Sequence, residues 1–452
     1  MEKNLTIGSV FKNVILFSLP YLLSYFLQTL YGMADLFIIG QFEGVASTTA
    51  VSIGSQVMHM LTVMIVGLAM GTTVSIGQAI GAGDRKQAAK DVGNTVTLFM
   101  AVSIALMAVL LVLVHPIISA MSTPTEAVKG TSAYLTICFI GVPFITAYNI
   151  ISSIFRGMGD SESPMYFIAV ACAANIGLDY LFMGILRLGP AGAALGTTLS
   201  QAVSVAVSLT VILKRKKIVL KEDDFKPYRP VMGKILKIGV PIAFQDGLIQ
   251  IAFIIITIIA NQRDLNDAAA VGIVEKVIGF LFLIPSSMLS TVSALGAQNI
   301  GAGKPERAFQ TLRYAILLTV GFGMLSSIVI QFAAEPIVSL FTDRNAEGGA
   351  DVIRLGGQYL RGYIWDSIFA GIHFSFSGYF CARGKSGLSF LHNILAIALV
   401  RIPGVHLTSQ LFPETLFPMG LATAAGSLTS VVICVIAFTV IRRKDRQLAL
   451  GG

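Results

Sequence analysis

Long apolar runs recur along the whole chain, and they constrain the fold more than any other feature of the sequence. A transmembrane helix needs about 20 consecutive apolar residues. Twelve runs reach that length, at residues 12–39, 46–78, 92–115, 131–154, 164–186, 191–213, 235–260, 268–299, 311–333, 357–381, 387–410 and 417–441. They do not alternate apolar and polar residues as the strands of a membrane β-barrel do. With only 12% charged residues, the chain is predicted to be an all-α polytopic membrane protein with twelve transmembrane helices.

The basic residues predict how these helices are oriented. If the N-terminus is cytoplasmic, 24 of the 32 Lys and Arg residues lie in inner segments and six lie in outer segments. This asymmetry satisfies the positive-inside rule, so both termini are predicted to be cytoplasmic. The net charge of +8 is therefore interpreted as a topology signal, and no nucleic-acid partner is expected. The basic run at 214–217 ends an apolar span, where contact with anionic lipid is the preferred interpretation.

Four short motifs occur twice in the same order, which indicates an internal duplication. The pairs are QAIGAGD (78–84) with QNIGAGK (298–304), Pro20 with Pro241, GDS (159–161) with GKS (384–386), and PAG (190–192) with PMG (418–420). Each half holds six helices, so two six-helix lobes related by a pseudo-twofold axis along the membrane normal are predicted, with a cavity between them. The predicted domains are an N-lobe (1–213), a cytoplasmic linker (214–233) and a C-lobe (234–452). The GAG segments lack phosphate-loop spacing and are interpreted as tight turns in which glycine adopts a positive φ.

The first apolar run contains Pro20 in its interior and Asp35 near its far end. A carboxylate inside the membrane costs about 2.5–3.5 kcal/mol on insertion scales and usually marks an ion or proton pathway. On a helix, one stripe contains Tyr21, Tyr25, Gln28, Gly32 and Asp35. We expect this stripe to face a cavity and Asp35 to exchange a cation there. Pro20 allows a kink, either as a hinge or as a static bend.

Asp179 lies in a second apolar run, with Asn175 one helical turn earlier on the same face. Counting along the two spans places Asp35 and Asp179 at a similar outer depth. The duplicated positions in the other half are Ile256 and Leu407, so the repeat architecture by itself does not require these acids. This asymmetry favours a functional pair, although local hydrogen bonding remains the alternative interpretation.

Three further acids, Asp246, Glu275 and Asp366, fall within apolar runs of the second half. They are candidates for the lining of a second-half cavity, and Asp366 is a candidate to pair with Arg401. Glu275 is either an ion-pair partner of Lys276 or a charge at a helix start. The membrane histidines occur singly and are interpreted as packed residues. Because HExxH, GxSxG and Ser–Lys arrangements are missing from the sequence, no enzyme activity is expected.

The chain resembles the MATE (multidrug and toxic compound extrusion) family, especially its bacterial drug-efflux members. The resemblance rests on LTIGSVFKNVILFSLP, YGMADLFIIGQFEG, QAIGAGD, FRGMGDSESPMYF, NIGLDYLF, GPAGAALGTT and QNIGAGKPERA, which together span most of the chain. It implies two six-helix lobes in the bacterial inner membrane and export of amphipathic, often cationic compounds in exchange for H⁺ or Na⁺. The family's N-lobe cation site matches Asp35, Asn175, Asp179 and Thr197 of this sequence, so Na⁺ at Asp35 and Asp179 is one alternative. A C-lobe acidic site has an unclear match near Asp366.

The predicted function is therefore cation-coupled antiport of small amphipathic substrates by a monomer in the lipid bilayer, with no cofactor besides the coupling ion. The predicted cavity residues are Tyr21, Tyr25, Gln28, Tyr31, Tyr148, Asn149, Asp246, Glu275 and Asp366. Aromatic faces and amides of this kind suit a cationic ligand, but they also fill space between helices. The alternative is a flippase for a lipid-linked saccharide, which would need several basic residues in the cavity. A channel would not require the duplicated lobes.

Overall fold

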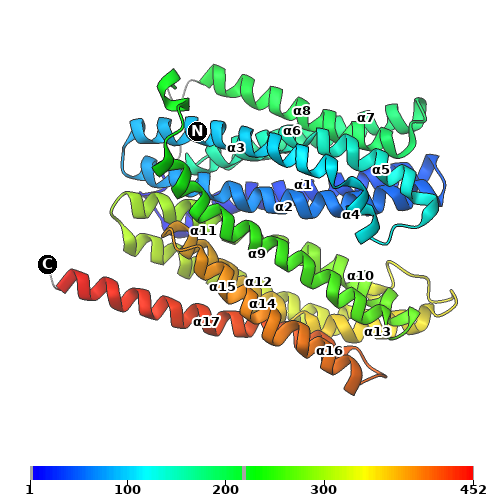
Figure 1. Ribbon diagram of the computed structural model, residues 1–452. Helices are drawn as coiled ribbons and strands as arrows, with labels where there is room; N and C mark the ends of the chain where they lie inside the picture. Colours follow the sequence, from blue (N-terminus) through cyan, green and yellow to red (C-terminus); the bar gives the residue numbers. More distant parts are fainter. Residues whose placement is uncertain (1–3, 216–219, 451–452) are drawn as a thin grey trace. The chain divides into compact units, whose positions relative to one another are not determined.

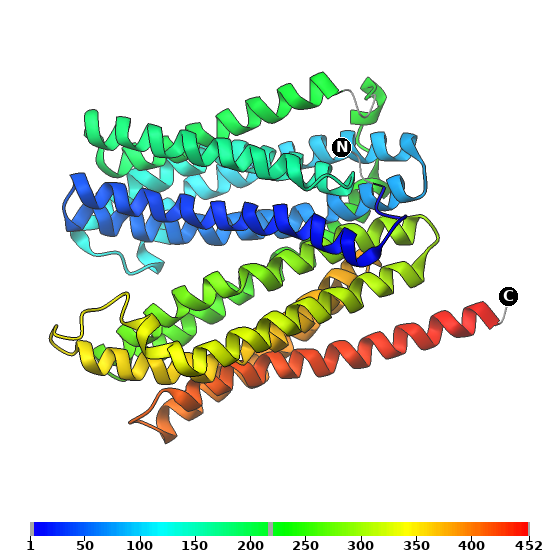
Figure 2. The ribbon, with the colours of Figure 1, turned by 180° about the vertical axis from the view of Figure 1, so that it is seen from behind.

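The described residues fold almost entirely into helices, many of them long. The computed structural model describes residues 4–215 and 220–450, and all regular structure in these two ranges is helical. Residues 216–219 of the predicted linker lie outside the described residues. Figures 1 and 2 show the helices from two opposite sides. The protein is an all-α polytopic membrane protein, as the apolar runs predict.

The first half contains eight α-helices and one π-helical segment in its described residues. They are α1 (Val10–Phe42), α2 (Val45–Gly81), α3 (Arg85–Val112), α4 (Val114–Ala120), α5 (Thr125–Ile140), α6 (Val142–Gly157), α7 (Glu162–Asp179), the π-helix η1 (Tyr180–Ile185) and α8 (Gly189–Arg215). Two polar side chains cap the N-termini of helices in this half. Ser9 accepts a hydrogen bond from the backbone N–H of Lys12 at the start of α1, and Asp84 accepts one from that of Gln87 at the start of α3.

The second half follows a short 3₁₀ turn, η2 (Glu222–Phe225). Its elements are α9 (Arg229–Asn261), α10 (Leu265–Leu281), α11 (Leu283–Gly301), α12 (Pro305–Val338), α13 (Gly349–Tyr363), α14 (Asp366–Ala382), α15 (Gly387–Ala396), the π-helix η3 (Ile397–Arg401), α16 (Ile402–Leu411) and α17 (Phe417–Leu450). Each half therefore contains one π-helical segment within its described residues. In both cases it interrupts the fifth predicted span of that half.

The observed helices follow the predicted spans closely, with two exceptions. Within the described residues, ten helical segments are long and apolar enough to cross a membrane. An eleventh candidate is the pair α5 and α6, which is bent by 48° near Gly141. The predicted span at 357–381 is divided between α13 and α14, with 15 and 17 residues, and neither is long enough alone.

The chain forms two compact units whose bounds differ from those of the predicted lobes. Unit 1 comprises Met1–Ala243 with Ala297–Lys304, and unit 2 comprises Phe244–Gly296 with Pro305–Gly452. The beginning of α9 packs inside unit 1, where Gly71 lies against the Ile235 carbonyl and Gly239 lies against the Leu68 carbonyl. Glycines at these two positions let α2 and α9 approach closely. Unit 1 therefore extends past the predicted linker to Ala243.

The duplicated glycine segments form the predicted tight turns. Gly83 and Gly303 have φ angles of 74° and 70°, a left-handed conformation that favours glycine. Within unit 1 the two segments also contact each other in a reciprocal way. Gly81 lies against the backbone carbonyl of Gln298, and Gly301 lies against that of Gln78. A Cβ atom at either glycine would collide with main chain, which explains why this motif is retained in both halves.

The described part of the linker is fixed to α3 within unit 1. Asn94 donates to the Asp224 carbonyl at 3.0 Å and accepts from the Tyr228 N–H at 2.7 Å, and Thr97 donates to the Phe225 carbonyl at 2.7 Å. The Lys90 ammonium lies over the Tyr228 ring, 3.4 Å from its centroid. Outside the membrane, the adjacent Lys226 lowers the pKa of Asp223 through a hydrogen bond.

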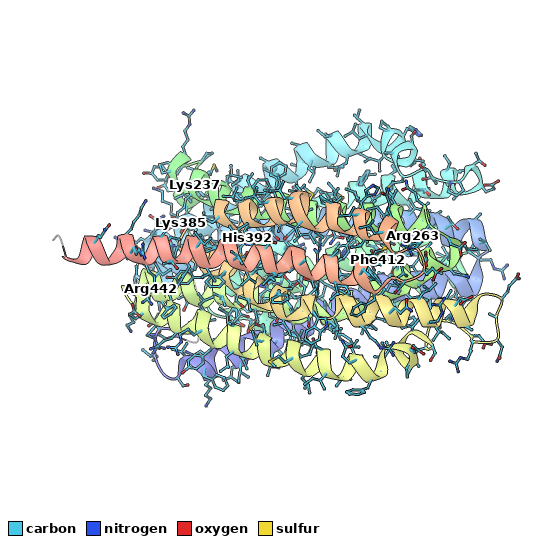
Figure 3. The ribbon with its side chains drawn as sticks, turned by 90° about the horizontal axis from the view of Figure 1, so that it is seen from below. Lys237, Arg263, Lys385, His392, Phe412 and Arg442 are labelled. Atoms are coloured by element: carbon cyan, nitrogen blue, oxygen red, sulfur yellow. The ribbon has the colours of Figure 1, made fainter. Side chains whose placement is uncertain are left out.

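Large apolar side chains cover the outer surfaces, as expected for helices in lipid. On α12, for example, Leu317, Leu325 and Phe332 are exposed, the last at 82%. Figure 3 shows Lys385 and Arg442 toward one end of unit 2 and Arg263 and Phe412 toward the other, with His392 between them. Arg263 joins α9 to the end of α16, because its guanidinium donates to the Ser409, Phe412 and Pro413 carbonyls and pairs with Asp267 at 2.6 Å.

Candidate functional site

Asp35 on α1 is the centre of a polar cluster inside unit 1. Its side chain is buried, with 2% exposure, and its Oδ2 accepts a hydrogen bond from Thr197 Oγ1 on α8 at 2.9 Å. One turn earlier on α1, the Tyr31 hydroxyl lies 2.9 Å from both the Thr197 carbonyl and the Ser200 hydroxyl. Tyr31 and Asp35 therefore fix α1 against the same turn of α8.

Asp179 on α7 reaches the same cluster from another side. It is fully buried, and its carboxyl group lies near enough to that of Asp35 for the two groups to influence each other electrostatically. Asn175, one turn earlier on α7 and also fully buried, lies near both carboxyl groups without a hydrogen bond of normal geometry to either one. The structure thus brings together Asp35, Asn175, Asp179 and Thr197 from three helices, although 144 residues separate the two acids.

The backbone around Asp179 departs from a regular α-helix. The α-helical part of α7 ends at Asp179, and the π-helix η1 begins at the next residue. Such π segments occur frequently at functional sites. On the facing helix, Gly196 lies directly against Asp179 Oδ1, so a side chain at this position would occupy the place of the carboxylate oxygen. The small residue is what allows the acid to sit between α7 and α8.

Several polar atoms of the cluster have no hydrogen-bond partner of normal geometry among the described residues. They are Asp35 Oδ1, both carboxylate oxygens of Asp179, and both amide atoms of Asn175. Leaving a buried polar atom without a partner costs about 1–3 kcal/mol, and more for a charged group. The unsatisfied carboxylate and amide oxygens fit a proton shared by the two acids or a hard cation such as Na⁺, which prefers oxygen ligands. In the described ranges, the His, Cys, Asp and Glu side chains form no group of three that would suit a transition metal.

The second-half acids lie in a different environment inside unit 2. Asp366 is fully buried and forms an ion pair with the buried guanidinium of Arg401, which is the pairing that the sequence suggests. Glu275 accepts a hydrogen bond from Thr257 at 3.0 Å, while Lys276 is exposed. Glu275 is therefore held by α9 and does not pair with the neighbouring lysine. Asp246 is half-buried on α9, next to Gln245.

Comparison with known proteins gives the family. The MatE family model matches residues 20–181 and 241–407, one stretch in each half of the chain. The chain belongs to the MatE family.

Relatives and solved structures of this MATE protein agree with that assignment. It is 27% identical over 398 residues to the probable multidrug resistance protein YpnP of Bacillus subtilis (strain 168), covering 88% of each chain. It is 26% identical over 343 residues to a protein of Shewanella oneidensis named FAD transporter, covering 74% of this chain and 75% of that protein. A crystal structure of MATE in complex with MaL6 superposes with a TM-score of 0.90 at 22% identity, covering 98% of both chains.

The aromatic residues predicted to line a cavity of this MATE protein are mostly packed in unit 1. Tyr21 and Tyr148 are 2% and 1% exposed. The Arg156 guanidinium lies over the Tyr21 ring, 4.1 Å from its centroid, so that face already holds a cation from the chain itself. Tyr25 lies beside Tyr21, with ring centroids 5.2 Å apart. A ligand could reach the Tyr21 face only after Arg156 moved.

The other predicted residues of unit 1 differ in how deeply they are buried and in their hydrogen bonds. Asn149 is buried and donates to the Ile145 carbonyl, while its Oδ1 has no partner among the described residues. Gln28 is half-buried on α1. Pro20, the predicted hinge, lies inside the continuous helix α1, and its carbonyl accepts a hydrogen bond from Ser24 at 2.9 Å. Their roles in substrate binding and bending stay predictions.

Sequence reasoning misses four features of the site in this MATE protein. It assigns Tyr31 to a substrate cavity, which stays a prediction, and it does not predict that the Tyr31 hydroxyl links α1 to α8 beside Asp35. It does not single out Gly196, although the spacing of four from Gly192 is typical of closely packed membrane helices. The π-helix after Asp179 has no signal in the sequence that we can identify. The stack of Arg156 on Tyr21 likewise depends on two distant segments.

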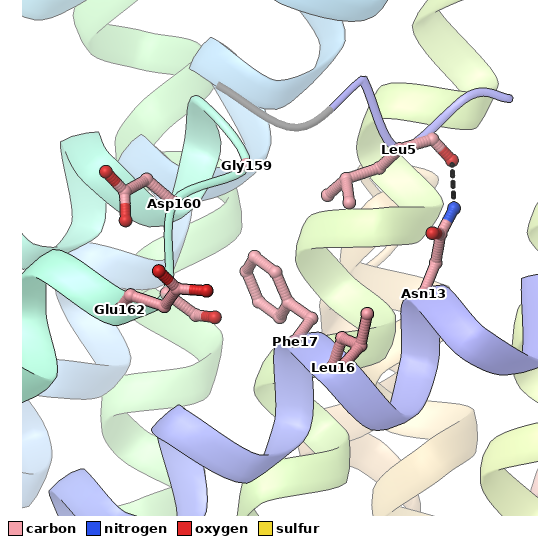
Figure 4. A pocket seen from close by; sticks show the side chains of 8 residues that line it. Leu5, Asn13, Leu16, Phe17, Gly159, Asp160 and Glu162 are labelled. Carbon is pink, nitrogen blue, oxygen red and sulfur yellow. Dashed lines mark hydrogen bonds between the residues drawn. The ribbon is translucent and has the colours of Figure 1, made fainter. Parts of the chain in front are cut away.

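A separate hollow lies in unit 1 between the start of α1 and the turn before α7 (Figure 4). The ring of Phe17 and the side chain of Leu16 line it, and Asn13 donates to the Leu5 carbonyl at its edge. Asp160, two residues before the start of α7, accepts hydrogen bonds from the Ser163 N–H and hydroxyl at 3.0 and 2.8 Å. These contacts hold the turn against the first residues of α7.

Proposed function

We propose that this MATE protein exports small amphipathic, often cationic compounds in exchange for H⁺ or Na⁺. The observation that carries the proposal is the buried pair of Asp35 and Asp179, whose oxygens lack partners among the described residues. Two carboxylates in a poorly hydrated site cannot both be charged cheaply, so the pair favours binding of one cation. Relatives named multidrug resistance proteins support drugs as the cargo.

The coupling arithmetic is adequate for an exporter. One proton moving inward across 100 mV contributes about 2.3 kcal/mol, and one pH unit contributes about 1.4 kcal/mol. Together these sustain a cargo gradient of several hundred-fold. A single cation bound at Asp35 and Asp179 is therefore sufficient to drive export. Thr197 and Asn175 would orient the two carboxyl groups, and binding or release of the cation would change the contacts between α1, α7 and α8.

The proposed setting is the bacterial inner membrane, with both termini cytoplasmic and the monomer as the working unit. The flippase alternative is less well supported, because a pyrophosphate group needs several free basic side chains. In unit 2 the guanidinium of Arg401 is already engaged by Asp366. The cargo cannot be taken from family membership alone, since one relative is named for a nucleotide cofactor and others for drug resistance.

The proposal is tested by dye efflux from proteoliposomes at clamped voltage, with the pH and Na⁺ gradients varied separately. We expect the wild-type flux to follow one of the two gradients and the Asp35→Asn variant to follow neither. Asp91→Asn is the matched control, because Asp91 is an equally buried acid in unit 1 whose oxygens are held by Ser75 and Gln87 at 2.8 and 2.6 Å. Passive flux in both directions, unaffected by either gradient, would show a channel instead.

A further inference from the structure

Two arginine side chains are buried in the part of the chain that the structure describes, and only one of them is paired with an acid. They are Arg156 at the end of α6 in unit 1 and Arg401 in unit 2, with 6% and 7% exposure. Arg401 forms an ion pair with Asp366. Arg156 forms no ion pair with a described residue, and its guanidinium lies over the Tyr21 ring. Because burying a charge without a counter-charge is costly, the charge of Arg156 needs an explanation beyond packing.

The face of α6 that ends in Arg156 also contains buried oxygen atoms without partners. Asn149 and Ser152 precede Arg156 by seven and four residues, so the three side chains share one face of the helix. Asn149 Oδ1 and Ser152 Oγ form no hydrogen bond among the described residues, whereas the Asn149 amide nitrogen donates to the Ile145 carbonyl at 2.8 Å. The Asn149 oxygen is therefore an acceptor that suits a donor or a cation, and it would repel an anion.

The stripe of α1 that contains Asp35 ends beside the same guanidinium. Tyr21 precedes Asp35 by 14 residues, which is about 21 Å along a helix. Tyr25 and Gln28 lie between them on this stripe and are half-buried. In the predicted topology the Tyr21 end of α1 is the cytoplasmic end. Arg156 therefore lies at a level of unit 1 between the buried acids and the predicted cytoplasmic side.

The charges along these faces define what the arrangement does to an ion. A cation that leaves the two acids toward Arg156 would meet acceptor oxygens first. One turn past Thr197 on α8, Gln201 Oε1 is a further buried oxygen without a partner among the described residues. Such a cation would then approach a guanidinium, which stays protonated at physiological pH. In a poorly hydrated interior two positive charges repel strongly, and arginines exclude cations from pores in the same way.

We propose that Arg156 is an electrostatic barrier that stops the coupling ion from leaking from Asp35 and Asp179 to the cytoplasmic side without exchange for cargo. The inference rests on the proposed function, because it takes the two acids to bind the ion. The Tyr21 ring holds the guanidinium in position, since a guanidinium stacks on an aromatic face better than an ammonium does. Release of the ion during export then requires Arg156 to leave the Tyr21 ring.

The test measures ion uptake by proteoliposomes that contain the full-length protein and no cargo. The voltage is clamped, an inward H⁺ or Na⁺ gradient is imposed, and a trapped pH dye or radioactive Na⁺ records the uptake. Arg156→Gln removes the charge and keeps a polar side chain, so we expect the coupling ion to enter about tenfold faster than in wild type, or more. Arg156→Lys keeps the charge and should stay tight. Arg443→Gln, at an exposed position on α17, is the control and should also stay tight. Equal uptake by Arg156→Gln and wild type would overturn the proposal.

Two further measurements separate the loss of a charge from a packing defect. Arg156→Gln combined with Asp35→Asn should be tight again, because the ion no longer binds at the acids. Chloride uptake, followed with a trapped fluorescent indicator, should not rise in Arg156→Gln. A leak that persists in the double variant, or chloride uptake that rises with it, would contradict the assignment. If the glutamine variant does not fold, Arg156→Met removes the same charge and should show the same leak.

The outcomes also separate this inference from the proposed function. If wild type exports no cargo although Arg156→Gln leaks through Asp35, the export function fails and the barrier stands. If wild type exports cargo against a gradient and Arg156→Gln stays tight, the barrier is wrong and export stands. The guanidinium of Arg156 would then only pack against Tyr21.

Discussion

The two compact units bury acids in opposite ways. In unit 1, Asp35 and Asp179 form no ion pair with a basic side chain of the described residues, and three of their four carboxylate oxygens lack a hydrogen-bond partner there. In unit 2, Asp366 is equally buried but is neutralised by Arg401. An acid without a fixed counter-charge can exchange a cation, whereas an acid with one mainly holds structure. This contrast supports the proposal that the coupling ion binds in unit 1.

The largest expected effect is on transport through unit 1. Asp35→Asn should abolish coupled efflux, because the amide cannot bind a proton or replace the carboxylate charge. Asp179→Asn should do the same. Under the proposed function the double variant should lose little more than either single one, because one change already removes the shared cation site. Efflux assays in vesicles measure this. Normal efflux by Asp35→Asn, or additive losses in the double variant, would break the comparison.

The next effect concerns stability in unit 2. Asp366→Asn leaves the buried guanidinium of Arg401 without its counter-charge and should destabilise the protein by about 3–5 kcal/mol. Thermal unfolding of the purified protein measures this loss, and Asp35→Asn should show no comparable decrease. In the double variant Asp366→Asn with Arg401→Met, most of the stability should return. If Asp366→Asn is as stable as wild type, the ion pair does not stabilise unit 2 and the contrast between the units fails.

A smaller effect is expected from crowding the unit 1 site. Gly196→Ala places a methyl group against Asp179 Oδ1 and should reduce coupled efflux about tenfold, because an overpacked site typically costs 1–3 kcal/mol. The control is Gly177→Ala on α7, two residues from Asp179, where a Cβ would meet no atom within 4 Å. Equal efflux by the two variants would show that the close approach of α8 to Asp179 is unimportant.

The smallest effect is expected at Tyr31. Tyr31→Phe removes the hydroxyl that bonds Thr197 and Ser200, which is worth about 1 kcal/mol. We expect a several-fold weaker apparent affinity for the coupling ion, with the maximal rate retained. Initial efflux rates measured over a range of coupling-ion concentrations give both quantities. An unchanged ion affinity would limit Tyr31 to packing between α1 and α8.

Much of the fold could be predicted because a membrane limits the choices. The apolar runs predict the helices. The GAG repeats predict tight turns, and the positive φ angles of Gly83 and Gly303 confirm them. The division into units could not be predicted in the same way, since it depends on where α9 and α11 pack. The close crossing of α2 and α9 at Gly71 and Gly239 decides this, and it involves residues far apart in the sequence.

Part of the candidate site could also be predicted, because the membrane makes buried acids stand out in the sequence. Asp35 and Asp179 are conspicuous because acids are rare in apolar spans, and depth counting placed them at one level. The pairing of Asp366 with Arg401 was one of several choices that the sequence allowed. Two contacts at the site depend on how α1, α7 and α8 rotate about their axes. They are Gly196 against Asp179 and the bond from the Tyr31 hydroxyl on α1 to α8. Helical periodicity does not fix that rotation between neighbouring helices.

The central claim is that cargo and a cation compete through Asp35 and Asp179. It is tested most directly by adding cargo to the purified protein in weakly buffered solution and recording the cation released, H⁺ with a pH-sensitive dye and Na⁺ with a radioactive tracer. We expect release of one of these ions from wild type and from Asp91→Asn, and none from Asp35→Asn. Undiminished release from Asp35→Asn, at matched cargo binding, would contradict the account.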